Sequence, residues 1–135
     1  MINYGFTKHL DMDFDAAVAL VKEHLQNEGF GILMAIDLQE KFREKLGIDF
    51  MRYVILGACD PVNACKAILC EENIGLLLPC NVIVYETEGG TTVGVIRPTV
   101  AMAMIDNLDL HRIAKDVERR LKAVIDALQP VAAVA

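Results

Sequence analysis

Two segments of the chain carry apolar residues at three- and four-residue intervals, the spacing of an amphipathic helix. The first predicts a helix that begins after a capping aspartate at position 11 or 13 and ends near residue 28, where Gly29 follows. The second runs from Asp109 to about residue 128, before Pro130, and has the strongest helical periodicity in the chain. These two segments are the expected main helices.

Strands are predicted where apolar residues alternate with polar ones or form short unbroken runs, at about residues 2–7, 30–36, 50–58, 80–86 and 91–97. The last two flank Gly89-Gly90, which predicts a hairpin. A short helical insert should begin at Asp37 and end at Gly47, with Leu38, Phe42 and Leu46 facing inward. Residues 74–78 fit either a loop packed inward or the start of the next strand, and residues 99–105 fit a short helix.

The clearest helix start follows the third strand. Asp60 can accept a hydrogen bond from a free backbone N–H of the first turn, and Pro61 suits the first helical position because its missing N–H costs nothing there. This helix should run to about residue 72. Its angular positions place Cys65 on the apolar face and Cys70 on the polar face, so we expect Cys65 to be buried and Cys70 to lie near the surface.

The order of these elements predicts an α+β fold with two layers. We expect a mainly antiparallel sheet of about five strands, two principal helices on one face, and short helical inserts. Without a repeat or a linker, residues 1–135 are expected to form a single domain. A sheet covered on one face should alternate apolar and polar residues, yet residues 30–36 and 53–56 do not. Because large apolar patches are rare on monomers, we expect a homodimer whose second subunit covers the rest.

Composition and charge narrow the classes of partner. The net charge of −6 and the absence of a basic stripe argue against nucleic-acid binding. No apolar run approaches the length of a membrane span, so we expect no membrane partner. The N-terminal residues lack the pattern of a signal peptide, so the expected location is cytoplasmic and the four cysteines should be reduced.

Few residues suggest chemistry. The cysteines are separated by five, four and nine residues, none as a C-x-x-C pair, and we expect no metal and no cofactor. No Ser-His-Asp set, phosphate-binding loop or paired-carboxylate motif is recognisable, and the sequence does not decide whether the protein is an enzyme.

One candidate site emerges at the edge of the predicted sheet. If the third and fourth strands are antiparallel neighbours, the end of one adjoins the start of the other. Cys59, Asp60, Pro79, Cys80 and Asn81 should then lie together, with the Cα atoms of the two cysteines within about 10 Å.

Two functions fit this candidate site. The first is a dimeric module that binds a small molecule or a protein partner without catalysis. The alternative is a thiol-dependent redox or sulfur- or anion-handling protein that uses Cys59 and Cys80. The helix N-terminus favours a thiolate and an anion there, whereas the Asp60 carboxylate disfavours a thiolate. Both cysteines are also suited to simple packing.

Two motifs carry a resemblance to a known family. The first is Gly57-Ala-Cys-Asp-Pro61, with Ala64 and Leu69 after it. The second is Leu76-Leu-Leu-Pro-Cys-Asn-Val-Ile-Val-Tyr-Glu86. Both resemble the bacterial and archaeal family called domain of unknown function 302. The likeness extends over nearly the whole chain, although the central motif is its specific part. It implies a small α+β dimer and no established activity. Cys65 and Cys70 look like additions peculiar to this chain.

Overall fold

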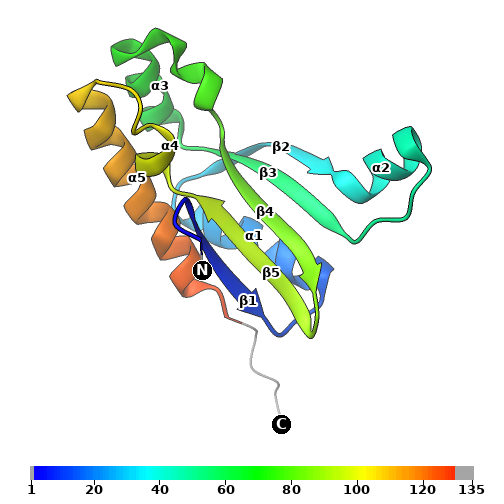
Figure 1. The fold of residues 1–135 in the computed structure, drawn as a ribbon. Helices are drawn as coiled ribbons and strands as arrows, with labels where there is room; N and C mark the ends of the chain where they lie inside the picture. Colours follow the sequence, from blue (N-terminus) through cyan, green and yellow to red (C-terminus); the bar gives the residue numbers. More distant parts are fainter. Residues whose placement is uncertain (1, 130–135) are drawn as a thin grey trace.

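The computed structural model describes residues 2–129, which form five strands and five α-helices with one 3-10 helix, η1. In chain order the elements are β1 (Gly5–Leu10), α1 (Phe14–Asn27), β2 (Gly31–Asp37), α2 (Leu38–Leu46), β3 (Tyr53–Cys59), α3 (Pro61–Cys70), η1 (Glu72–Leu77), β4 (Cys80–Thr87), β5 (Gly90–Ile96), α4 (Pro98–Ala101) and α5 (Leu108–Ala127). Figure 1 follows them along the chain.

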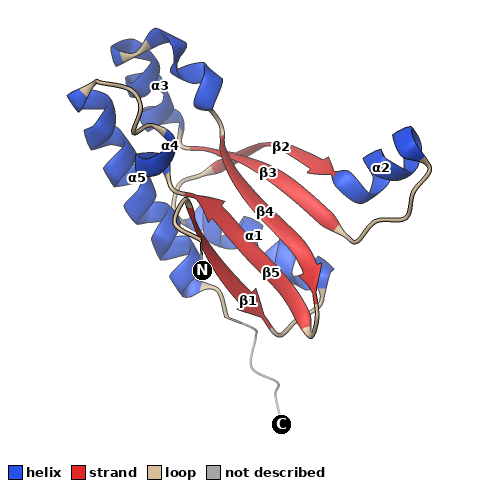
Figure 2. Ribbon diagram, viewed as in Figure 1, coloured by secondary structure: helices blue, strands red, loops and turns tan. Residues whose placement is uncertain are grey.

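The five strands form one sheet in the order β1-β5-β4-β3-β2, and every neighbouring pair is antiparallel. Helices α1 and α5 pack on the same face of this sheet, as Figure 2 shows. The predicted α+β fold, with a five-stranded antiparallel sheet and two main helices, is confirmed.

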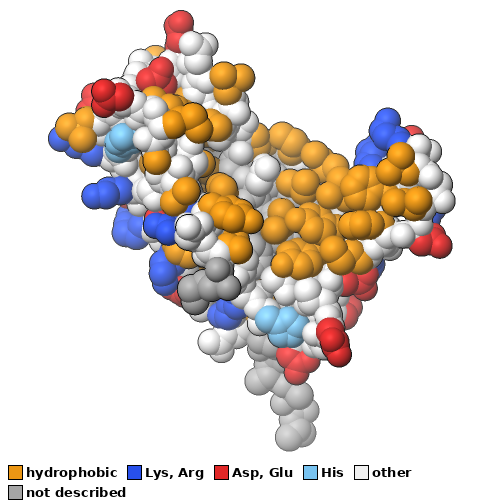
Figure 3. All heavy atoms as spheres, in the orientation of Figure 1, with side chains coloured by type: hydrophobic (Ala, Val, Ile, Leu, Met, Phe, Trp, Pro, Cys, Tyr) orange, Lys and Arg blue, Asp and Glu red, His pale blue; other side chains and the backbone are white. Residues whose placement is uncertain are grey.

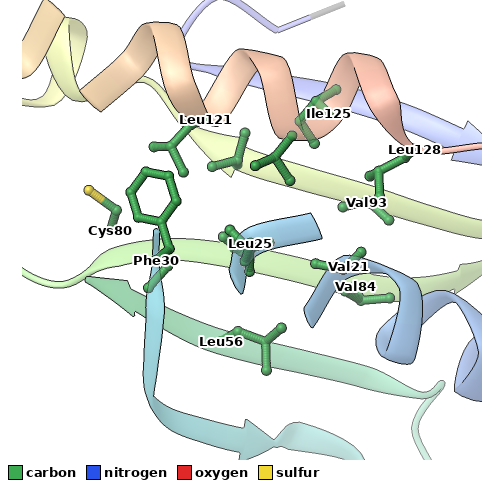
Figure 4. Close-up of a cluster of buried hydrophobic side chains, with 14 of the residues drawn as sticks. Val21, Leu25, Phe30, Leu56, Cys80, Val84, Val93, Leu121, Ile125 and Leu128 are labelled. Carbon is green, nitrogen blue, oxygen red and sulfur yellow. The ribbon is translucent and has the colours of Figure 1, made fainter. Parts of the chain in front are cut away.

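The main core lies between the sheet and these two helices. Alternate residues of the central strands point toward the helices, as expected for a period of two, and meet apolar residues spaced along α1 and α5 (Figure 4). Its largest fully buried side chains include Leu25, Phe30, Leu56, Leu121 and Leu128. A second, smaller cluster joins α3, η1 and the start of α5; its buried members are Ala67, Ile74, Met102, Leu110 and Ala114.

Several predicted boundaries are confirmed. Helix α1 follows Asp13 and is ended by Gly29, whose φ of 85° few other residues adopt. Helix α2 begins at its cap Asp37, whose side chain accepts a hydrogen bond from the Glu40 N–H, and ends at Gly47 with φ 65°. These signals depend on only a few neighbouring residues, so they could be predicted from the sequence.

Other boundaries differ from the prediction. Strand β1 begins at Gly5, three residues later than expected. The cap of α5 is Asn107, whose side-chain oxygen accepts from the Leu110 N–H, so Asp109 lies inside the helix. Residues 74–78 fall mainly within η1, with Ile74 buried, which matches the packed-loop alternative. The predicted stop at Pro130 lies outside the described residues.

The prediction of which residues are buried is wrong for two short helices, α3 and α2. Cys65 is exposed and Cys70 is partly buried, because α3 turns its small residues, with Ala67 fully buried, toward the second cluster. The apolar face that contains Cys65 points away from the body of the protein. In α2 no residue is buried, so Leu38, Phe42 and Leu46 do not reach the core. Helical periodicity shows which residues share a face but not what that face contacts.

None of the described helices is long and apolar enough to cross a membrane.

Candidate functional site

The five candidate residues meet at the end of the sheet where β3 finishes and β4 begins. Ala58 is paired with Cys80 across the two strands, and Gly57 with Asn81. Paired Cα atoms lie about 5 Å apart and the next residue adds about 4 Å, so the Cα atoms of Cys59 and Cys80 are within about 9 Å of each other. The antiparallel neighbours that the sequence predicts are therefore confirmed.

Cys59 and Cys80 share a small inner cavity beneath the helices. Its volume is about 30 Å³, which is room for one water-sized molecule. Asp60 and Asn63 are its polar lining residues, and the rest of its wall is apolar or thiol. The lining residues are Phe30, Ala58, Cys59, Asp60, Asn63, Ala64, Ala67, Leu78, Cys80, Pro98, Met102, Ile113, Ala114 and Val117.

A larger depression, here called the sheet-end hollow, lies on the other side of Cys80. Its volume is about 290 Å³. It is formed by η1, the first residues of β4 and the segment around α4, and Pro79, Cys80 and Asn81 of the candidate set line it. Its lining residues are Leu76, Leu77, Leu78, Pro79, Cys80, Asn81, Ile96, Pro98, Ala101 and Met102. Leu78, Cys80, Pro98 and Met102 line both spaces and so separate them.

The environment of both thiols favours their protonated form. Burial, and then the adjacent Asp60 carboxylate, raise the pKa of Cys59 above its ordinary value. Burial raises the pKa of Cys80 to about 11, and the nearby Cys59 adds to this shift. The site therefore does not lower a thiol pKa, contrary to the effect expected from the start of α3.

Asp60 is held by partners from α3 and α5. Its side chain accepts hydrogen bonds from the Val62 N–H at 3.2 Å and from the Asn63 amide at 2.7 Å, and it forms an ion pair with Arg120. Burial alone would raise the pKa of Asp60, but the hydrogen bonds from Arg120 and Asn63 outweigh it and lower that pKa. Asp60 therefore carries its charge at neutral pH, with its partners already in place.

The start of α3 has less to offer an external anion than the sequence suggested. The Asp60 carboxylate already accepts from the first turn of the helix, and its negative charge stands where an anion would approach. The positive charge of Arg120 is also occupied, because it pairs with Asp60 and donates to the Glu28 carbonyl. The geometry consequently favours a neutral ligand over an anionic one.

Sequence reasoning missed the α5 side of this site. Arg120 crosses to Asp60, a partner sixty residues earlier, and its guanidinium also lies 4.9 Å from the centre of the Phe30 ring. Asp116 accepts a hydrogen bond from Asn63. The only available signal was the position of Arg120 beside the apolar stripe of α5, and many solvated arginines share that position.

Within residues 2–129, no group of three or more His, Cys, Asp and Glu side chains is arranged to hold a metal ion. The three histidines contribute nothing to the sheet-end hollow.

Comparison with known families agrees with this architecture. A family model described as domain of unknown function DUF302 matches residues 6–128. The chain belongs to this family. Its description carries no activity, so membership identifies the fold and the relatives of this DUF302 protein without assigning catalytic residues.

A solved structure supports the same assignment. This DUF302 protein is similar to the crystal structure of an uncharacterized conserved DUF302 protein from Bacillus stearothermophilus, with 33% sequence identity and a TM-score of 0.85. The match covers 93% of this chain and 98% of the Bacillus chain. No curated protein matches the chain.

Proposed function

We propose that this protein is a homodimeric binding module that takes up a small, neutral, largely apolar molecule in the sheet-end hollow, without covalent chemistry of its own. The observation that carries this proposal is the chemistry of the hollow. Its wall is mostly aliphatic, with a protonated thiol at Cys80 and the amide of Asn81 as neutral polar groups. Sites for small molecules typically combine apolar walls with a few polar groups in this way.

The size of the hollow limits the ligand. A dry apolar cavity of about 150 Å³ is known to accept benzene, so about 290 Å³ accommodates a single substituted ring or a short aliphatic chain. Met102 lies in the wall shared with the inner cavity, and a flexible methionine side chain can adjust to ligands of different shape. Asn81 supplies the hydrogen bond that would orient a hydroxyl or carbonyl group.

The dimer part of the proposal rests on apolar surface that this chain leaves uncovered. Figure 3 shows hydrophobic side chains gathered over β2–β4 and continuing onto α2. Tyr53 and Tyr85 stack on this side of the sheet with ring centroids 5.1 Å apart. Exposed large apolar residues at or beside this surface are Ile2, Tyr4, Leu33, Met34, Leu46, Ile48, Phe50 and Met51. Patches of this extent commonly mark protein interfaces.

A thiol-dependent redox or sulfur-handling activity is the second candidate. The proximity of Cys59 and Cys80 at the sheet edge favours it. Their raised pKa values oppose it, since the thiolate is the reactive form. The binding module is therefore the function that the geometry supports better.

Titration with two matched probes tests the proposal. Benzyl alcohol and benzoate have nearly the same shape but differ in charge. We expect benzyl alcohol to raise the thermal midpoint of the dimer, because a ligand that binds only the folded state stabilises it, and we expect at least tenfold weaker binding of benzoate.

A filled hollow provides the control. Ala101 lines the hollow, whereas the nearby Ala103 is exposed and does not. Ala101→Phe should abolish the response to benzyl alcohol, and Ala103→Phe should leave it unchanged. No response in the unmodified protein, or an equal response in both variants, would contradict the proposal.

A further inference from the structure

Helix α2 and its following connection form a projection that packs on little of its own chain. We call residues 38–51 the arm. Leu38, Phe42 and Leu46 recur at four-residue intervals, so they make one apolar stripe. Phe42 meets Phe50 edge to face at 4.9 Å, yet no residue of α2 is buried and Leu46 is 65% exposed. Figure 1 shows α2 standing beyond the ends of β2 and β3 rather than over the sheet.

The sheet has a second apolar surface, on the side away from α1 and α5. We call this the open face; it comprises the outward side chains of β1, β5, β4 and β3. An apolar depression of about 170 Å³ lies on it, lined in part by Tyr4, Ile83 and Gly94. Asn81 and Ile96 line both this depression and the sheet-end hollow, so the two spaces meet at these residues.

We infer that the arm of a second copy of this chain docks on the open face and forms the missing wall of the sheet-end hollow. A two-fold dimer pairs each arm with the other copy's face, so one contact made twice covers both surfaces and closes the assembly. The arm lies at the Tyr53 end of the open face, and Asn81 lies at the opposite end. A two-fold axis across the strands exchanges these ends and carries the partner's arm to the hollow.

The available surface matches a dimer of ordinary size. The eight exposed apolar side chains at or beside these surfaces, at roughly 90 Å² of exposed area each, present about 700 Å² per copy. A standard interface buries about 800 Å² per partner. The rest of the contact would come from Tyr53, Ile83 and Tyr85, which are partly buried on the open face.

Photo-crosslinking tests where the arm lies. With p-benzoylphenylalanine in place of Leu46, we expect crosslinks between copies to residues 76–83 or to Ile96, shown as intermolecular by mixing isotope-labelled and unlabelled chains. Leu108 is the matched control, because it is also a leucine at 65% exposure but begins α5; the probe there should give no crosslink to the open face. Leu46 crosslinks that map to α5, or only within one chain, would overturn the inference.

A second experiment tests whether docking of the arm affects ligand binding in the hollow. Leu46→Glu should raise the dimer dissociation constant at least tenfold in sedimentation, and weaken benzyl alcohol binding at least threefold, while Leu108→Glu changes neither. The inference about binding rests on the proposed function, and the two fail differently. Crosslinks without benzyl alcohol binding would support the arm and refute the function. Binding by a monomer, unaffected by Leu46→Glu, would overturn the arm and the dimer, and would keep only the ligand-binding part of the proposed function.

Discussion

At the scale of single residues, the Asp60–Arg120 pair is the main electrostatic link between α3 and α5. The Asp60 side chain is 9% exposed and that of Arg120 is 20% exposed, so solvent screens the pair only weakly. Removing one member of a buried pair leaves a charge without its partner, which typically costs about 3–5 kcal/mol. The partial exposure of Arg120 reduces that cost here.

We predict that Asp60→Asn lowers the free energy of unfolding by about 2–4 kcal/mol at pH 7. Because the folded state lowers the Asp60 pKa, its contribution is present above the unfolded value near 3.8 and is lost as the pH falls through the folded pKa. Urea unfolding at pH 7 and pH 3 should show the difference between wild type and variant shrinking at the lower pH.

Asp109→Asn is the control for this prediction. Asp109 pairs with Arg112 within one helix, and both side chains are about 70% exposed, so its loss should change stability by less than about 0.5 kcal/mol. An Asp60→Asn cost as small as that of the control, or one equal at both pH values, would refute a structural role for the pair.

Residue-scale features were predictable where their cause is local. The cap at Asp60 and the adjacency of Cys59 and Cys80 followed from turn chemistry and from antiparallel pairing. The Arg120 partner did not, because it depends on how α5 crosses the sheet, and no short pattern encodes that crossing. Because the pairing of Arg120 with Asp60 was missed, the sequence also predicted an anion site where the Asp60 carboxylate already has its partners.

At the scale of elements, helix α3 carries two cysteines, Cys65 and Cys70, that lie apart from Cys59 and Cys80 at the end of the sheet. Cys65 is exposed with Val62 and Leu69, and the Cys70 thiol donates to the Ala67 carbonyl at 3.4 Å. The sequence placed Cys65 with the correct neighbours but on the wrong side of the helix relative to the core. The small residues of α3 allow it to pack closely against α5. Helical periodicity gives more weight to large apolar residues than to small ones, so it assigned the wrong face of α3 to the core.

We predict that iodoacetamide at pH 8 alkylates Cys65 first and Cys80 last. Cys80 is 7% exposed and has a pKa of about 11, which leaves roughly one molecule in a thousand as thiolate at pH 8. Its rate should keep rising with pH above 9. Peptide mass spectrometry over time gives the order, and Cys65→Ser should remove only the fastest reaction. Faster labelling of Cys59 or Cys80 than of Cys65 would revive the thiol-dependent function.

The arm shows the same limit of element-scale prediction. The boundaries of its helix α2, Asp37 and Gly47, could be predicted because helix capping and left-handed backbone are local properties. Its stripe was expected to face the core, since amphipathic helices usually pack on their own chain. An unburied stripe is consistent with a surface completed by another chain.

At the scale of the whole molecule, unbroken apolar runs on a two-layer fold indicated that one face of the sheet lacked cover. The sequence could predict this from the missing alternation in residues 30–36 and 53–56, since a solvated face needs polar residues. It could not predict the sheet-end hollow. That space arises where η1, β4 and α4 meet, and its walls come from segments separated by up to about 25 residues.

The most direct test of the proposed binding function is methionine methyl NMR of the dimer during titration with benzyl alcohol. Met102 lines the hollow, whereas Met12 packs against the main core and does not line it. Met102→Leu assigns the signal with little change in volume. We predict a saturable shift of the Met102 methyl that Ala101→Phe removes, with Met12 unmoved. A Met102 signal that does not move at saturating benzyl alcohol, or one that moves equally in Ala101→Phe, would contradict binding in the hollow.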